Sequence, residues 1–221
     1  MNIFDIMGPI MVGPSSSHTA GAARIGFVSR QLLGSEVSSA EILLHGSFAA
    51  TGKGHGTDKA IVAGLMGMKP DDERIPDAFT IAKEKGIEIK VGEVVLKTEF
   101  ANACLLNLNS KTGRSLSIVA ASLGGGRISI EQIDGIDTRF SGDYPTLIVH
   151  NIDQPGHIAE VTSTLAHKSV NIATLNLYRD KRGGYAVMII ETDQDIPESA
   201  IKWIEHLEGI IKVTYLNIER G

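Results

Sequence analysis

The chain has 221 residues, of which 43% are hydrophobic and 21% charged, and its formal net charge is −5 at pH 7. These values indicate a soluble globular protein with one large domain or two small ones. The negative net charge and the lack of a long Lys/Arg run argue against nucleic acid as the main partner. No apolar run reaches the length of a transmembrane helix, and the first residues lack the basic segment of a signal peptide, so we expect a cytoplasmic protein with no membrane partner.

The first part of the chain, residues 1–142, alternates helical and strand patterns and is rich in Gly and Ser. Ser, His and Thr supply capping groups for the first predicted helix, which ends before Gly34. A glycine-rich loop, HGSFAATGKGHGTD (45–58), is expected after the first strand. The predicted helices are 18–33, 57–68 and 76–86, and the predicted strands are 40–46, 87–91, 103–110, 114–122 and 127–133.

The second part, residues 145–221, follows a polar, turn-rich boundary at 137–145. Its pattern predicts strands at 146–152, 170–180, 185–193 and 210–218, with helices at 154–169 and 197–209. The order βαββαβ is typical of a ferredoxin-like unit, in which two helices cover one face of a four-stranded antiparallel sheet. We therefore predict an α+β protein of two domains, 1–142 and 145–221.

The stretch GPSSSHTAG (13–21) places three serines, a histidine and a threonine in one tight turn. One serine is enough to cap a helix, so a simple cap explains only part of the pattern. A helix N-terminus with additional hydroxyl groups could also hold the carboxylate of a small amino acid. From these residues alone, a cap and a ligand site both stay open.

The loop 45–58 does not fit a nucleotide-binding motif. Five residues separate Gly46 from Gly52 where a Walker loop needs four, and Gly54 stands where Ser or Thr would bind magnesium. The histidines lack the paired spacing of zinc ligands, so we expect no metal site in this chain. The polar residues in the loop instead favour a small ligand over a merely solvated loop.

Three stretches resemble known families. The segment DQPGHIAEVTSTLAHKSVNIATLNLYR (153–179) resembles the ACT domain, a regulatory module that often binds amino acids at dimer interfaces. GPSSSHTAGAARIG and HGSFAATGKGHGTD together resemble the β chain of the iron–sulfur-dependent L-serine dehydratases, and the match spans essentially the whole chain. The first part also resembles the allosteric substrate-binding domain of some 3-phosphoglycerate dehydrogenases.

The resemblance implies conversion of L-serine to pyruvate and ammonia, with His55 first and His18 second as polar groups near the reacting centre. Whether either is a general base or a positioning donor stays open, and the base could belong to another chain. The implied substrate-binding residues are Ser15, Ser16, Ser17, Thr19, Ser47, Lys53 and Thr57. The implied effector-binding residues in the ACT domain are Asp153, Gly156, His157 and Asn171.

The family's [4Fe–4S] cluster is implied to be ligated by a partner α subunit, because Cys104 is the sole cysteine here and lies in an apolar strand pattern. Activity would then require the α subunit, and the ACT domain would pair two copies of this chain. Two alternatives remain: a standalone sensor that binds serine or a related amino acid, and a structural dimerisation subunit. The second would leave the polar stretches unexplained.

Overall fold

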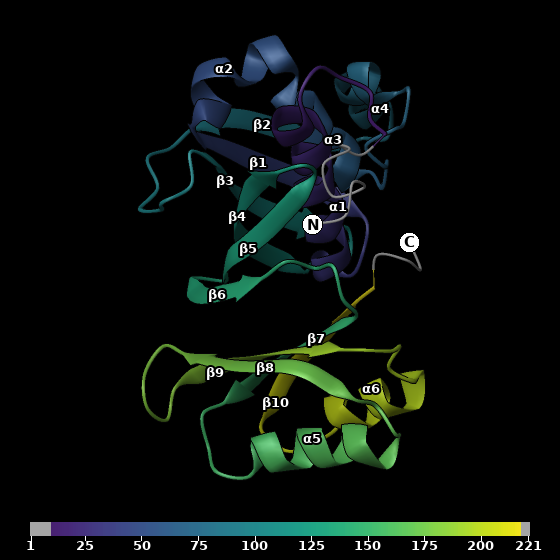
Figure 1. The fold of residues 1–221 in the computed structure, drawn as a ribbon, viewed down its shortest axis with the longest axis vertical. Helices are drawn as coiled ribbons and strands as arrows, with labels where there is room; N and C mark the ends of the chain where they lie inside the picture. The colour runs from purple at the N-terminus through teal and green to yellow at the C-terminus, as the bar shows by residue number, and fades with distance from the viewer. Residues whose placement is uncertain (1–9, 218–221) are drawn as a thin grey trace. The chain divides into compact units, whose positions relative to one another are not determined.

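The structure is a computed structural model that describes residues 10–217. The chain divides into two compact units, residues 1–135 and 136–221, and each combines helices with a sheet (Figure 1). The predicted α+β class is confirmed.

The first unit is organised around five strands with the order β2-β1-β3-β4-β5. Strand β1 pairs with β2 in parallel, whereas the β1–β3, β3–β4 and β4–β5 pairs are antiparallel. These strands are β1 (Val37–Gly46), β2 (Glu88–Glu93), β3 (Asn102–Ser110), β4 (Ser115–Gly124) and β5 (Arg127–Ile133). Strand β6 (Ile136–Phe140) begins the second unit.

Six helical segments accompany this sheet. They are the π-helix η2 (Ser16–Gly21), α1 (Ala22–Leu33), α2 (Ser47–His55), α3 (Thr57–Leu65), the 3-10 turn η3 (Ile75–Asp77) and α4 (Ala78–Glu84). The wide turns of η2 run directly into α1, which ends at Gly34 in the left-handed conformation. Helix α1 packs on both α3 and β4.

Helices α1 and α3 touch at two glycines. A Cβ on Gly26 would overlap the carbonyl oxygen of Ile61, and a Cβ on Gly64 would overlap that of Ala23. Only glycine allows the two backbones to approach this closely. Because α1 follows η2 and α3 follows α2, this contact sets the spacing between the two polar stretches.

One sequence prediction is wrong in the first unit, and the segment predicted as a boundary contains a strand. The stretch expected as a loop at 45–58 contains helix α2, although Gly52 and Gly54 are poor helix formers. Phe48 is fully buried and anchors this helix, and tertiary packing outweighs the local propensity. The boundary 137–145 contains strand β6, in which Thr138 and Phe140 are buried.

The second unit has the predicted four-stranded antiparallel sheet, with the order β10-β7-β9-β8. Its elements are β7 (Thr146–Ile152), α5 (His157–His167), β8 (Ile172–Arg179), β9 (Tyr185–Thr192), α6 (Glu198–Glu205) and β10 (Ile210–Leu216). Both helices lie on one face of the sheet (Figure 1). Val161 and Leu165 of α5 and Ile204 of α6 join Leu147 and Ile190 in its core.

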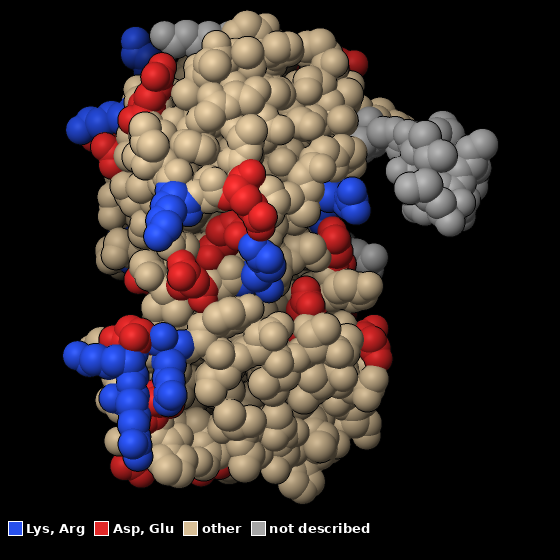
Figure 2. Space-filling view, turned by 60° about the vertical axis from the view of Figure 1, so that its left-hand side comes forward, with Lys and Arg blue, Asp and Glu red and all other residues tan. Residues whose placement is uncertain are grey.

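Within residues 10–217, no helix is both long enough and apolar enough to cross a membrane. On the face drawn in Figure 2, the Lys and Arg side chains form separate groups with Asp and Glu beside them.

The helix contact leads to a stability prediction. Gly64→Ala should lower the free energy of unfolding by about 1–3 kcal/mol, because the added methyl group overpacks a backbone contact. Gly54→Ala is the matched control: its Cβ meets nothing within 4 Å. Since alanine favours a helix over glycine, this control should leave stability unchanged or raise it slightly. Urea unfolding of both variants measures the difference, and equal midpoints would contradict the proposed contact.

Candidate active site

His18 is the centre of a hydrogen-bonded cluster in the first unit. Its backbone N–H donates to Ser15 Oγ over 3.1 Å, and the same Oγ lies 3.4 Å from the ring Nδ1. Its Nε2 lies 3.2 Å from Ser47 Oγ and 3.1 Å from Thr51 Oγ1. The cluster therefore joins η2 to α2 and brings the two polar stretches of the sequence together.

The hydroxyl partners determine where His18 carries its hydrogen. The Thr51 hydroxyl donates to the Ser47 carbonyl over 2.9 Å, so its oxygen is left to accept from Nε2–H of His18. Nδ1 then accepts from the Ser15 hydroxyl. In this arrangement neutral His18 has both ring nitrogens engaged by the chain itself.

The pKa of His18 is lowered from its ordinary value of 6.5, chiefly because burial disfavours the charged ring. Hydrogen bonding to Ser47 opposes this shift, and repulsion from His55 adds to it. The Phe48 ring meets His18 edge-on, with 5.3 Å between centroids, and supplies part of the apolar surroundings. The site therefore favours neutral His18 at neutral pH.

His55 lies beside His18 but has a different hydrogen-bonding pattern. The two ring centroids are 5.0 Å apart. Nδ1 of His55 lies 3.1 Å from the Thr51 carbonyl oxygen, which can only accept, so Nδ1 carries the hydrogen. Among the described residues, Nε2 of neutral His55 has no partner, so it is an acceptor on an exposed side chain that could take up a proton.

The other serines of the turn face a glycine turn between β4 and β5. The backbone N–H of Gly125 donates to Ser16 Oγ over 3.3 Å. A Cβ on Gly124 would lie 3.6 Å from Ser17 Oγ, and a Cβ on Gly21 would overlap Ser122 Oγ. Two predicted serines are therefore close to a segment about a hundred residues later in the chain.

The remaining predicted substrate residues lie at different depths. Thr19 and Thr57 are buried, and neither hydroxyl has a hydrogen-bond partner among the described residues. Thr19 lies against Gly13, where a Cβ would meet its side chain. The side chain of Lys53 is outside the described part of the structure.

Two features of the site were missing from the predicted residues. Thr51 links Ser47 to His18; it belongs to the polar stretch 45–58 but was not among the predicted binding residues. The turn Gly124–Gly126 has three consecutive glycines with positive φ, and that run was the one signal available.

The predicted effector residues do not converge within one copy of the chain. Asp153 accepts from Arg179 Nη1 and from the Gly183 N–H, and the Gly183 hydrogen bond is the main reason that its pKa is lowered. Asn171 lies beyond the opposite end of the sheet, where its Nδ2 donates to Asp193 over 2.5 Å. The length of a seven-residue strand, roughly 20 Å, separates the two ends.

Gly156 and His157 lie at the start of α5. Gly156 has a positive φ of 107° and precedes the helix. The His157 ring is buried against Gly209, and its Nδ1 lies 3.7 Å from Glu160. His157 therefore packs within the domain.

The described residues do not fit an iron–sulfur cluster. Among residues 10–217, no three His, Cys, Asp or Glu side chains are placed to hold a metal ion. Cys104 is buried in β3 between Leu44 and Ala120, and burial raises the pKa of its thiol to about 12. A cluster needs thiolate ligands, and this thiol is neither charged nor accessible.

Comparisons with known proteins match two separate segments of the chain to protein families. The family described as "Serine dehydratase beta chain" matches residues 2–90, and the ACT domain matches residues 145–208. The chain is 42% identical to the probable L-serine dehydratase beta chain of Bacillus subtilis, with 96% of each chain covered. It is 37% identical to the L-serine dehydratase beta chain of Peptoniphilus asaccharolyticus, with 97% of each covered. A D-3-phosphoglycerate dehydrogenase of Methanocaldococcus jannaschii is 27% identical, over 89% of this chain and 37% of that protein.

The surroundings of His18 predict its titration. In NMR spectra of the imidazole nitrogens, the midpoint of His18 should lie below 6.5. His55→Gln should raise this midpoint only in part, because burial is the larger cause. Since the unfolded chain binds the proton more readily, acidification below 6.5 should destabilise the folded chain through this group. A midpoint at or above 6.5 would show that the ring is not held neutral.

Proposed function

The chain belongs to the L-serine dehydratase beta chain family, and from that premise we propose that it is the β subunit of a [4Fe–4S]-dependent enzyme that converts L-serine to pyruvate and ammonia. The observation that carries this proposal is the His18 cluster, because it unites the two polar stretches at one place. A helix cap alone would need only the Ser15 hydrogen bond.

In the proposed reaction, serine loses its Cα proton and its β-hydroxyl group, which leaves as water. The resulting aminoacrylate tautomerises to an imine, and hydrolysis of the imine gives pyruvate and ammonia. His55 is the better placed histidine to accept the Cα proton, because its Nε2 is free whereas His18 Nε2 donates to Thr51. His18 would position the surrounding hydroxyls.

The serine-rich turn would hold the carboxylate of the substrate. Ser15, Ser16 and Ser17 stand at the N-terminal end of η2, and the N-terminus of a helix favours an anion. Ser47 and Lys53 come from the second polar stretch, and Thr19 and Thr57 pack behind these segments. Holding the substrate in this way reduces the entropic cost of reaching the transition state.

The α subunit would supply the cysteines that ligate the cluster and thereby complete the active site. The buried, neutral Cys104 supports this division of labour. The ACT domain would pair two copies of the chain and regulate the enzyme through Asp153, Gly156, His157 and Asn171. Because Asp153 and Asn171 lie at opposite ends of one sheet, a shared effector site would need residues from both copies.

A second candidate function is a standalone regulatory module that binds serine or a related amino acid. The similarity to a D-3-phosphoglycerate dehydrogenase over 89% of the chain favours it. The two functions differ in one respect that can be measured, because only the β subunit should release pyruvate when an α subunit is added.

The purified chain should therefore be colourless, free of stoichiometric iron and unable to form pyruvate from serine. Light scattering should give the mass of a dimer. After anaerobic mixing with a reconstituted α subunit, pyruvate should form. The two-subunit proposal would be refuted if the chain alone bound iron and released pyruvate unaided. Pairing through the ACT domain would be refuted if the mass at high concentration were that of a monomer.

The role of His55 can be tested with a matched surface histidine. His55→Ala should lower the rate of the reconstituted complex by about 10²- to 10⁴-fold, the usual loss for a proton-transfer group. His167→Ala is the control, because the His167 Nδ1 makes the same bond to a carbonyl four residues earlier, over 2.8 Å. The control should keep its activity, and a His55→Ala complex with normal turnover would exclude proton transfer by this residue.

A further inference from the structure

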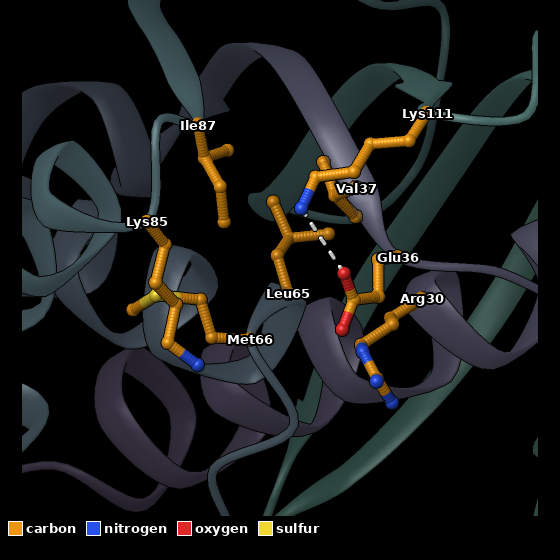
Figure 3. Close-up of a pocket in the computed structure, with 8 residues that line it drawn as sticks. All are labelled: Arg30, Glu36, Val37, Leu65, Met66, Lys85, Ile87 and Lys111. Atoms are coloured by element: carbon orange, nitrogen blue, oxygen red, sulfur yellow. Dashed lines mark hydrogen bonds and ion pairs between the residues drawn. The ribbon is translucent and has the colours of Figure 1, made fainter.

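The first unit contains a cavity of about 370 Å³ that shares no lining residue with the His18 cluster. Its floor is apolar and is formed by Val37, Leu65, Met66 and Ile87 (Figure 3). Val37 and Leu65 are almost fully buried. The volume lies within the range of pockets that bind small molecules.

Charged groups surround this apolar floor. Arg30 and Glu36 lie on one side, Lys85 lies on the other, and Leu65 is between them (Figure 3). Lys111 donates to Glu36 over 3.2 Å. Three cations and one carboxylate leave two positive charges uncompensated, in a chain whose net charge is −5.

The side chains of Arg30 and Lys85 make no hydrogen bond or ion pair within the described part of the chain. Among residues 10–217, neither has a hydrogen-bond or ion-pair partner. Both residues lie near helix C-termini, where a cation could cap free carbonyl groups. Backbone N–H groups already donate to carbonyls there: that of Gly34 at the end of α1 and that of Gly86 at the end of α4. Capping therefore does not account for the two free cations.

Glu36 shows how the charged residues around the cavity stabilise a carboxylate. Its pKa is lowered, first by the hydrogen bond from Lys111 and then by attraction to Lys111, Arg30 and Lys85. All three cations thus attract a negative charge at the cavity mouth. A second carboxylate could use Arg30 and Lys85, which Glu36 leaves unbonded.

We propose that this cavity is a binding site for a small organic carboxylate with a branched apolar body. The carboxylate would meet Arg30 and Lys85, and the apolar body would lie on the half-buried Met66 and Ile87. An inorganic anion would leave the apolar floor uncovered, and a neutral hydrocarbon would leave the two cations without a partner. This site shares no lining residue with the His18 cluster, so the inference does not rest on the proposed function.

The probe is 4-methylpentanoate, titrated into the full ¹⁵N-labelled chain and followed by amide NMR. Saturable shifts should centre on Leu65, Met66 and Ile87. The alcohol 4-methylpentan-1-ol keeps the body without the charge, and acetate keeps the charge without the body. Each should bind at least about tenfold more weakly, because the alcohol loses the hydrogen bonds between charged groups and acetate loses the burial of the apolar body.

Charge-removing variants complete the test. Arg30→Gln and Lys85→Gln should each weaken binding of 4-methylpentanoate about tenfold, and these exposed or half-buried changes leave the core intact. Lys83→Gln is the control, because Lys83 lies two residues earlier on α4 and does not line the cavity. Equal binding of the alcohol, unchanged affinity in both variants, or no saturable shift in the millimolar range would overturn the proposal.

Discussion

The contact between helices α1 and α3 at Gly26 and Gly64 is the constraint on which the site depends. Each helix continues from a segment that carries a histidine, so the distance between the helix backbones sets the distance between His18 and His55. A side chain at either glycine would push the helices apart by the thickness of a methyl group. A hydrogen bond such as the one from His18 Nε2 to Thr51 Oγ1 does not survive a displacement of that size.

The two histidines have the same chemistry in isolation and different chemistry in this fold. His55 bonds to a carbonyl four residues earlier, as His167 and His206 also do on helices of the second unit. That local bond therefore does not mark a functional residue. His55 differs from these two residues because it lies beside His18. Hydroxyl groups engage both ring nitrogens of His18, so Nε2 of His55 is the nitrogen of the pair that is left to act.

Much of the fold could be predicted from periodicity, because the strands and helices of the second unit alternate with clear apolar patterns. Helix α2 could not, since its glycines disfavour a helix and only the burial of Phe48 overrides them. The two polar stretches were identified as site segments from their composition. The contact of Ser16 with Gly125 could not be foreseen, because it joins residues 109 positions apart and leaves no local pattern.

The burial of Cys104 has a practical consequence. A thiol with a pKa of about 12 in the middle of a sheet reacts with alkylating reagents only when β1, β3 and β4 separate. As the chain has no other cysteine, one covalent mass increment per molecule reports that event alone. The rate of thiol labelling therefore measures how often the central strands of the native sheet open, without a denaturant or an introduced probe.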